Sequence, residues 1–294
     1  MNITNSMYLQ HFGLTDPPFR ITPHPAFFFG GGRRSEVLAA LRYAVLHGEG
    51  LVKVVGEVGS GKTMLCRMLL EQLAGDADLV FMPHPLLERD EILDAIAAEL
   101  GLPAVTGYAG ARVQALQLAL IERFGRGRRV VVVVDEAHAM QLQSLETIRL
   151  LSNLDHGHDK LLQIVLFGQP ELDQRLKNYE LRQFSERITH AFSLQPLRRD
   201  ELSAYLEFRL RAAGYCGPQP FSAAALRQIA GSAEGLVRRA NILADKALLA
   251  AYAEGAHAVT RRHARAAVAD CGYRRSGLPC RMLGALAAFR FRHA

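Results

Sequence analysis

A glycine-rich segment between an apolar run and a helical pattern constrains this chain more than any other feature. The apolar run covers 51–55, and the helical pattern covers 64–73. The segment between them reads Gly56-Glu57-Val58-Gly59-Ser60-Gly61-Lys62-Thr63. Successive backbone N–H groups that end on the positive N-terminus of a helix hold phosphate oxygens, and glycines let the backbone come close to them. The order of strand, loop and helix therefore predicts a P-loop, which binds the phosphates of a nucleotide.

The side chains at the end of this loop predict the cofactors. In this interpretation Lys62 reaches the β- and γ-phosphates, and the hydroxyl of Thr63 is a ligand of Mg²⁺. The backbone from Gly56 to Met64 surrounds the phosphates. The alternative is a glycine-rich turn that matches the pattern by chance, which the flanking strand and helix disfavour. We therefore expect the cofactors to be ATP and Mg²⁺.

A second candidate motif follows a run of valines over 130–134, which is typical of a strand buried on both faces. The run ends in Asp135 and Glu136. A carboxylate at the tip of such a strand, next to a P-loop, suits the Mg²⁺ shell directly or through water, so we expect Asp135 to be a metal ligand. Glu136 is placed to take a proton from the attacking water. The alternative is a pair of solvent-facing carboxylates that cap a helix.

Two polar residues near these motifs have open roles. Gln169 follows the apolar run 161–167 and can orient water or contact the γ-phosphate, or it can bond its own backbone. His138 is as consistent with a structural role as with a functional one.

The order of elements predicts two folded units with flanking segments. Strand patterns alternate with helical patterns as far as Pro196, which indicates a parallel sheet covered on both faces, and only helical periodicity follows. Proline, glycine and aromatic residues favour an irregular segment over 7–32. The expected divisions are an N-terminal irregular segment (1–32), a P-loop ATPase core (33–195), a small all-helical lid domain (196–270) and a basic tail (271–294).

The net charge of +6 is unevenly distributed. Residues 261–294 hold eight arginines and one acidic residue, so the other 27 basic and 28 acidic residues nearly cancel. A nucleic-acid-binding surface would need an excess of basic residues in the body of the protein, so a nucleic-acid partner is not expected. The tail is either a solvated end or a segment that lies on an anionic membrane surface. With neither a secretory pattern nor an apolar stretch of the ~20 residues that span a bilayer, we expect a cytoplasmic protein, free or peripheral on the inner membrane.

Together these motifs resemble the AAA+ ATPases of the additional-strand P-loop class, and within them the ExeA/GspA type of secretion ATPase. The likeness covers 7–270 and extends to the short members of this type that serve MSHA pili, which have neither a transmembrane helix nor a peptidoglycan-binding domain. Besides the P-loop, it depends on MYL (7–9), FGL (12–14), DPPF (16–19), VVDEAH (133–138), FGQPEL (167–172), LRQFSERI (181–188) and EGLVRRAN (234–241).

The resemblance implies a five-stranded parallel sheet ordered 5-1-4-3-2, and an ATP site at the junction of core and lid that a neighbouring subunit completes. It assigns Gln169 to the sensor 1 position and either Arg187 or Arg182 to the arginine finger.

The resemblance also assigns Arg238 to the sensor 2 position. Family members often have proline before this arginine, where this chain has Val237, which leaves the choice between Arg238 and Arg239 open.

These features favour an ATP-hydrolysing assembly factor for a type IV, MSHA-like pilus or a type II secretion-like machine. Such a protein would form a nucleotide-dependent homo-oligomer and act with inner-membrane pilus or secretion assembly proteins. One alternative is a DNA-targeting transposition ATPase of the TniB type, which the near-neutral body disfavours. Another is a signalling switch in which slow hydrolysis only times the release of a partner.

Overall fold

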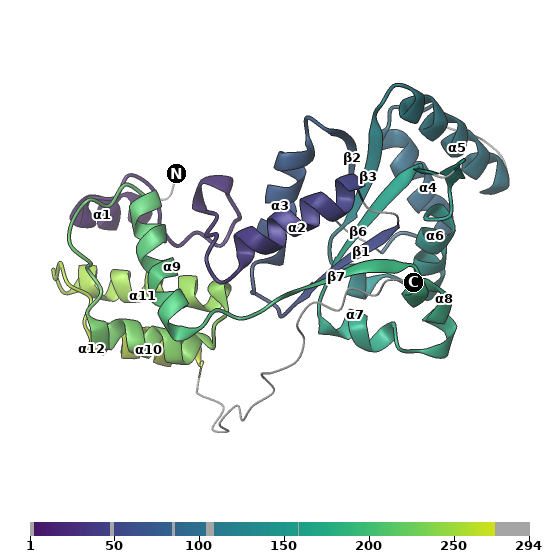
Figure 1. The fold of residues 1–294 in the computed structure, drawn as a ribbon. Coiled ribbons are helices and arrows are strands. Elements are labelled where there is room, and N and C mark those ends of the chain that lie inside the picture. The colour runs from purple at the N-terminus through teal and green to yellow at the C-terminus, as the bar shows by residue number, and fades with distance from the viewer. Residues whose placement is uncertain (1–2, 48–49, 84–85, 104–108, 158, 274–294) are drawn as a thin grey trace.

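The computed structural model describes residues 3–47, 50–83, 86–103, 109–157 and 159–273. It consists of an α/β core and a helical lid, which lie at the right and the left of Figure 1. The strands of the core sheet are β1 (Leu51–Gly56), β2 (Ala77–Met82), β3 (Arg129–Val134), β6 (Leu162–Gly168) and β7 (Ile188–Leu194). All of the strand pairs are parallel, and the order is β2-β3-β6-β1-β7. Numbered along the chain this is 2-3-4-1-5, so the expected order is confirmed.

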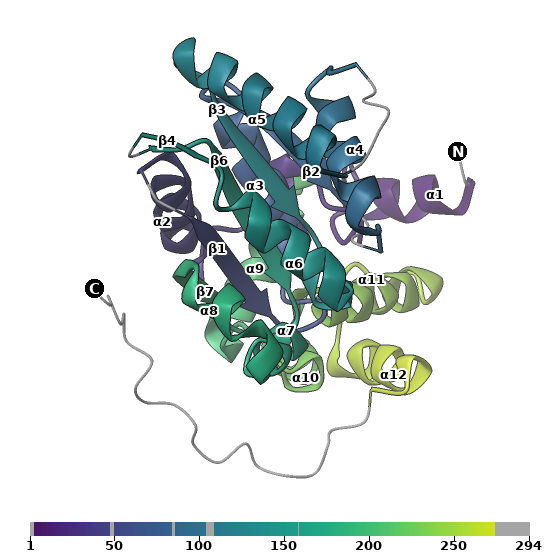
Figure 2. The same cartoon turned by 90° about the vertical axis from the view of Figure 1, so that its right-hand side faces the viewer.

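Helices cover both faces of the sheet, as expected. The helices of the core are α2 (Arg34–His47), α3 (Lys62–Leu73), α4 (Arg89–Glu99), α5 (Ala109–Gly125), α6 (Leu142–Leu151), α7 (Pro170–Arg175) and α8 (Arg182–Glu186). Helices α4, α5 and α6 lie on the side of the sheet that faces the viewer in Figure 2, and α2 and α3 lie on the other side.

Strand β3 shows why the run of valines is needed at the centre of this sheet. Val130, Val132 and Val134 pack in the apolar cluster under α4, α5 and α6. Val131 and Val133 pack in the cluster under α2 and α3. Successive side chains of a strand point to opposite faces, so a strand covered on both sides requires an apolar residue at every position.

The remaining elements are short. They are the 3-10 turns η1 (Pro25–Phe27), η2 (Ala137–Ala139) and η3 (Tyr179–Leu181), and a small hairpin of β4 (Asp155–His156) and β5 (Asp159–Lys160). The sequence patterns did not indicate the hairpin. Helix α7 ends at Arg175, and η3 follows it at Tyr179.

The lid is helical, as expected, and consists of α9 (Arg199–Ala212), α10 (Ala223–Ala233), α11 (Val237–Ala253) and α12 (Arg261–Cys271). Its apolar cluster includes Leu206, Ile229 and Leu248, which are fully buried. The loops before α10 and α12 meet in a parallel bridge between Phe221 and Val259. The lid therefore has its own hydrophobic core, separate from the two layers around the sheet.

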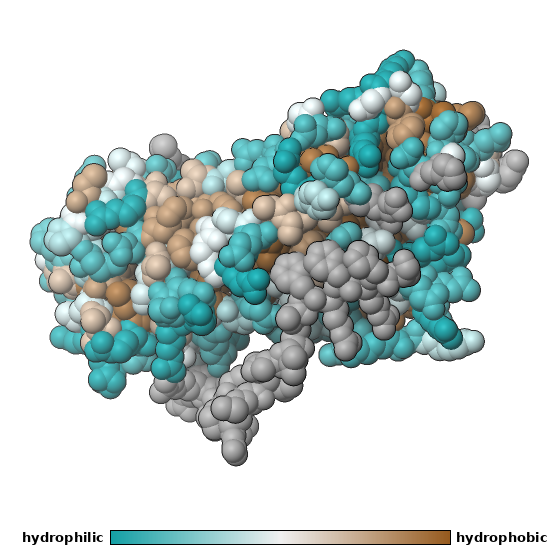
Figure 3. Space-filling view, in the orientation of Figure 1, coloured by the Kyte–Doolittle hydropathy of each residue, from teal (hydrophilic) through white to brown (hydrophobic). Residues whose placement is uncertain are grey.

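The prediction of an irregular N-terminal segment is wrong at its start, where residues Ile3–Phe12 form helix α1. Tyr8, Phe12 and Phe19 are buried in the apolar cluster of the lid. The Tyr8 hydroxyl donates a hydrogen bond to Asp245 of α11 at 3.0 Å. Figure 3 shows hydrophobic residues gathered at the surface between the lid and the core. Contacts with the lid, rather than helical periodicity of its own, stabilise α1.

None of the helices within the described ranges is long and apolar enough to cross a membrane. The prediction that the basic tail is either solvated or membrane-bound concerns 274–294, which lie outside the described residues.

Candidate nucleotide-binding site

The glycine-rich segment forms a tight loop between β1 and the start of α3. Gly59 and Gly61 have φ angles of 79° and 103°, which favour glycine. Helix α3 begins at Lys62, whose side chain is 5% exposed. Its Nζ donates hydrogen bonds to Gly56 O at 2.8 Å and Glu57 O at 3.0 Å. The ammonium group therefore lies over the loop, where phosphates can replace the two carbonyls.

The surroundings of Lys62 bring the two predicted motifs together. Burial lowers the pKa of the Lys62 ammonium, while the charges of Glu136, Asp135, Glu57 and Glu171 act in the opposite direction. The strongest of these charges are the two carboxylates that follow β3. The sequence places them far from the P-loop, and the parallel order of β1, β6 and β3 brings them to the same edge of the sheet.

Asp135 and Thr63 form the candidate metal site. Asp135 is 6% exposed, and its Oδ1 accepts a hydrogen bond from the Glu136 N–H at 2.9 Å. Burial raises the pKa of the Asp135 carboxyl, against the effects of this hydrogen bond, of Lys62 and of the Thr63 side chain, which acts on the same carboxylate. A divalent cation would restore the charged form, because carboxylate and hydroxyl oxygens are the ligands that Mg²⁺ prefers.

Glu136 is held in an uncommon conformation at the edge of the site. Its φ is 54°, in the left-handed region that non-glycine residues rarely adopt. Its Oε2 accepts a hydrogen bond from Gln169 Nε2 at 3.2 Å, and His138 Nδ1 lies 3.3 Å away. The His138 contact does not have the alignment of a hydrogen bond. The structure therefore brings Gln169 to the predicted general base, at the point where β6 ends and α7 begins.

These residues fit a magnesium nucleotide. The loop offers a helix N-terminus, Lys62 offers an ammonium group, and Thr63 with Asp135 offers oxygen ligands. The Ser60 Oγ is buried without a hydrogen-bond partner among the described residues, which leaves a polar atom available inside the loop.

The lid reaches the same loop through α11. The Arg238 N–H donates a hydrogen bond to Gly59 O at 3.1 Å. A Cβ at Gly59 would lie 2.9 Å from the Arg238 Cβ, so only glycine fits here. Arg239 instead pairs with Glu234 at 2.5 Å and lies over the Tyr273 ring. This geometry favours Arg238 over Arg239 for the sensor 2 position, which remains a prediction.

The structure does not bring the two predicted finger arginines to this site. Arg187 is exposed, and its carbonyl oxygen accepts a hydrogen bond from the Leu51 N–H at 3.2 Å, at the start of β1. Arg182 is also exposed and pairs with Glu186 at 3.1 Å. The P-loop follows the opposite end of β1, about 17 Å away at ~3.3 Å per residue. Neither arginine can act on the phosphates of its own chain from this position.

The sequence analysis missed Arg34, which is 5% exposed and donates a hydrogen bond to Ser60 O at 3.0 Å. An arginine at the start of an amphipathic helix usually indicates a solvated side chain, so the sequence carried no signal for this contact.

Comparison with known proteins agrees with this geometry. Residues 45–176 match the family model described as an AAA domain. The chain is 39% identical over 288 residues to general secretion pathway protein A of Aeromonas hydrophila. The match covers 95% of this chain and 52% of the relative, so the chain spans about half the length of the curated relative that it matches.

Solved structures share the fold at low sequence identity. Cdc6p from Pyrobaculum aerophilum has a TM-score of 0.66 at 19% identity, covering 87% of this chain and 71% of that one. The ORC2 protein of Aeropyrum pernix, solved with ADPNP and ADP, has a TM-score of 0.61 at 18% identity, covering 86% and 71%. The RuvB branch migration motor of Thermotoga maritima has a TM-score of 0.57 at 18% identity, covering 86% and 73%. The chain thus has the AAA+ P-loop fold with a C-terminal helical lid; residues 45–176 match the AAA domain model, and the chain is similar over 95% of its length to general secretion pathway protein A.

Proposed function

We propose that this protein hydrolyses Mg-ATP to assemble a type IV pilus of the MSHA type or a type II secretion-like machine, in the role of the MSHA pilus biogenesis protein MshM. The observation that carries the enzymatic part is the meeting of Lys62, Thr63, Asp135 and Glu136 at one edge of the sheet. The homology to a general secretion pathway protein supports the biological part. In the cell we expect it in the cytoplasm, acting with inner-membrane assembly proteins.

The residues of the site have separable roles in hydrolysis. The loop and Lys62 bind the β- and γ-phosphates, and Thr63 with Asp135 holds the cation. Mg²⁺, when bound, neutralises part of the charge on the phosphates. Glu136 accepts the proton of the attacking water, and Gln169, which donates to Glu136 in this structure, orients that water.

A complete site requires a second copy of the chain. Charge that develops on the transferred phosphoryl group calls for a further cation, and Arg187 lies at the far end of β1 from its own P-loop. An exposed Arg187 or Arg182 of a neighbouring chain can supply it. An arginine finger is worth about 10³ to 10⁵ in turnover, whereas a solvated arginine contributes almost nothing.

Phosphate release by mixed variants tests this assembly. Arg187→Ala should bind Mg-ATP but lose most hydrolysis, and Glu136→Gln should do the same. Mixing the two should restore part of the activity, because one of the interfaces then pairs an intact Glu136 with an intact Arg187. Arg182→Ala, mixed in the same way, decides between the two arginines.

Specific activity should also rise with protein concentration. Activity per subunit that is independent of concentration, with no recovery in either mixture, would contradict the assembly proposal.

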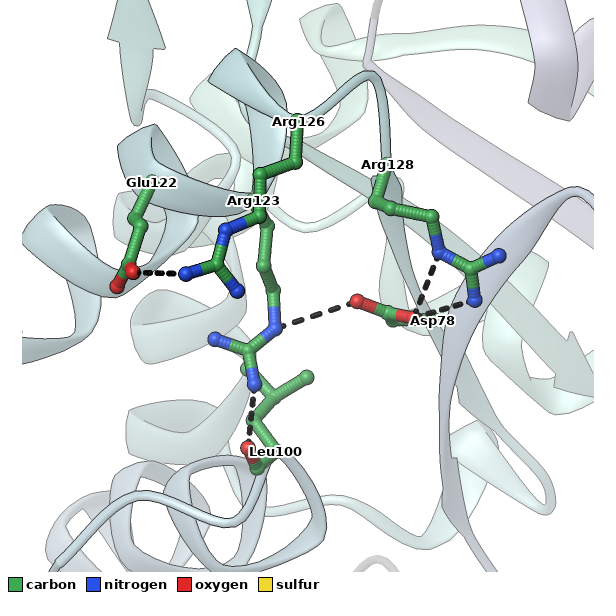
Figure 4. Close-up of polar contacts among 6 residues, drawn as sticks. All are labelled: Asp78, Leu100, Glu122, Arg123, Arg126 and Arg128. Carbon is green, nitrogen blue, oxygen red and sulfur yellow. Dashed lines mark hydrogen bonds and ion pairs between the residues drawn. The ribbon is translucent and has the colours of Figure 1, made fainter.

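The alternative of a DNA-targeting ATPase is disfavoured by the way the arginines around 125–129 are paired. Arg123 and Arg128 both form ion pairs with Asp78 of the edge strand β2, at 3.2 and 2.6 Å, and Arg126 pairs with Glu122 (Figure 4). These ion pairs, three arginines on two carboxylates, neutralise part of the positive charge that this loop could offer to a phosphate backbone. Measurement of hydrolysis with and without duplex DNA separates the two functions: stimulation by DNA would favour the alternative.

A further inference from the structure

Two adjacent arginines at the start of α2 have opposite environments. Arg33 is exposed, with 72% of its side chain accessible, and pairs with Glu36 at 3.0 Å. Arg34 is 5% exposed; its Nη2 donates a hydrogen bond to Ser60 O at 3.0 Å, and its Nη1 lies 3.5 Å from Gly31 O. A buried guanidinium costs free energy unless hydrogen bonds compensate it, and the shorter of these contacts is with the P-loop.

The geometry of the peptide unit gives this contact a consequence. In a trans peptide the C=O and the following N–H point in opposite directions, and the described residues contain no cis peptide. A Ser60 carbonyl held on the side of α2 therefore turns the Gly61 N–H to the opposite side. The Gly61 N–H donates to no backbone carbonyl of the described residues, and it directly precedes α3. It is thus oriented with the first N–H groups of α3, which form the anion-binding end of that helix.

The guanidinium also lies against the lid. Burial lowers the pKa of Arg34, and the charges of Tyr205 and Glu201 on α9 oppose this shift. A Cβ at Gly32 would meet Leu197 Cδ2 at 2.4 Å, Arg34 Nη1 at 2.6 Å and Glu201 Oε2 at 3.5 Å. The arginine and the lid therefore occupy the space that a side chain at Gly32 would need. Movement of α9 relative to α2 would change the surroundings of the group that holds Ser60.

We propose that Arg34 is a positioning residue of the phosphate-binding loop, which aims the Gly61 N–H at the nucleotide phosphates and links this orientation to the position of the lid through Glu201. This role deepens the proposed function, since it depends on nucleotide binding at the P-loop.

The variant Arg34→Met tests the positioning role, because methionine fills much of the same volume without hydrogen-bond donors. The readouts are the Kd for Mg-ATP, measured by calorimetry, and the melting temperature of the nucleotide-free protein. We expect Kd to rise about 10- to 100-fold, as for the loss of a charge-assisted hydrogen bond. The melting temperature should change little, because the removal of a buried charge offsets the cost of a Ser60 carbonyl left without its donor. Loss of a merely structural contact would lower the melting temperature instead.

Two further variants serve as the comparison set. Arg34→Lys keeps one donor and should recover part of the affinity, and Arg33→Ala should bind Mg-ATP like the parent. Parental affinity in Arg34→Met, or an equal loss in Arg33→Ala, would overturn the role of Arg34 while leaving the proposed ATPase intact. A parent protein that binds no Mg-ATP would overturn both.

The variant Glu201→Gln tests the link to the lid. Glu201 Oε2 accepts a hydrogen bond from the Arg198 N–H at 2.8 Å, and the glutamine oxygen can still accept it. We expect this substitution to weaken Mg-ATP binding a few-fold in the parent and not at all in the Arg34→Met background. An equal effect in both backgrounds would refute the coupling, because independent sites add.

Discussion

Replacement of Asp135 by asparagine should move the stability of this protein in opposite directions with and without nucleotide. Asp135 is 6% exposed, and burial raises the pKa of its carboxyl despite the hydrogen bond from the Glu136 N–H and the opposing effect of the Thr63 side chain. Asparagine keeps the shape of the side chain and an oxygen that can accept from the Glu136 N–H, but it has no charge. The substitution therefore separates the cost of the buried charge from the rest of the contacts.

The sign of the effect follows from the raised pKa. A carboxyl with a folded-state pKa above the ordinary value of 3.8 contributes stability below that pH, and this stability is lost as the pH rises through the folded-state pKa. At pH 7.5, well above the ordinary pKa, the buried Asp135 carboxyl lowers the free energy of unfolding of the nucleotide-free parent. Removal of the charge should raise the free energy of unfolding by about 1 kcal/mol, since the weakened attraction to Lys62 offsets part of the gain. For a domain of this size the melting temperature should rise by ~2–4 °C.

Mg-ATP should reverse the order of the two proteins. A ligand at 100 times its Kd stabilises the folded state by about 2.7 kcal/mol, and the parent should gain this. The asparagine variant lacks the ionised metal ligand and should gain little.

The assay is thermal unfolding at pH 5.5 and 7.5, with and without Mg-ATP. Asp155→Asn serves as the control, because Asp155 is exposed and forms a long ion pair with Lys160 at 3.5 Å. A nucleotide-free variant that melts below the parent and keeps the full Mg-ATP shift would refute the assignment of Asp135.

Two other substitutions test contacts around the lid. Gly59→Ala should weaken Mg-ATP binding at least tenfold, because the new Cβ would lie 2.9 Å from the Arg238 Cβ at a residue whose φ is 79°. Gly75→Ala is the control, because no heavy atom lies within 4 Å of a Cβ added there. Equal affinities of the two variants in calorimetry would contradict the lid contact. Tyr8→Phe should lower the free energy of unfolding by about 1–3 kcal/mol, because it leaves the partly buried Asp245 carboxylate without its donor at 3.0 Å. Urea unfolding measures the loss; no greater effect than in Tyr43→Phe, at a tyrosine that is 66% exposed, would show that α1 does not depend on this bond.

The sequence was sufficient for those parts of the site that depend on local pattern. A glycine-rich turn between a strand and a helix has few other uses, and a run of valines that ends in two carboxylates specifies a buried strand and its tip. Parallel topology then places Asp135 near Lys62 without further information. The order of the strands came from the family resemblance, since periodicity contains no record of which strands are neighbours.

The contacts that the sequence did not indicate are tertiary. Helix α1 lacks an apolar stripe of its own and is stabilised by the lid, so its residues have the composition of a loop. The side chains of Arg33 and Arg34 are chemically identical, and only the position of the P-loop carbonyl decides which one is buried. The choice between Arg238 and Arg239 likewise needs the hydrogen bond to Gly59, which joins residues far apart in the chain.

The central claim, that residues 56–63 bind Mg-ATP, is tested most directly by titration calorimetry of the parent and Lys62→Ala. Within the part of the chain that the structure describes, the Nζ of Lys62 bonds the Gly56 and Glu57 carbonyls of the loop and can exchange them for phosphates. Its removal should weaken Mg-ATP binding at least about 100-fold, the equivalent of two charge-assisted hydrogen bonds. The matched control is Lys53→Ala, since Lys53 lies on β1 but pairs with Asp173 at 2.6 Å. The account predicts near-parental affinity for the control and almost no heat for Lys62→Ala; a Kd for Lys62→Ala within twofold of the parent would contradict it.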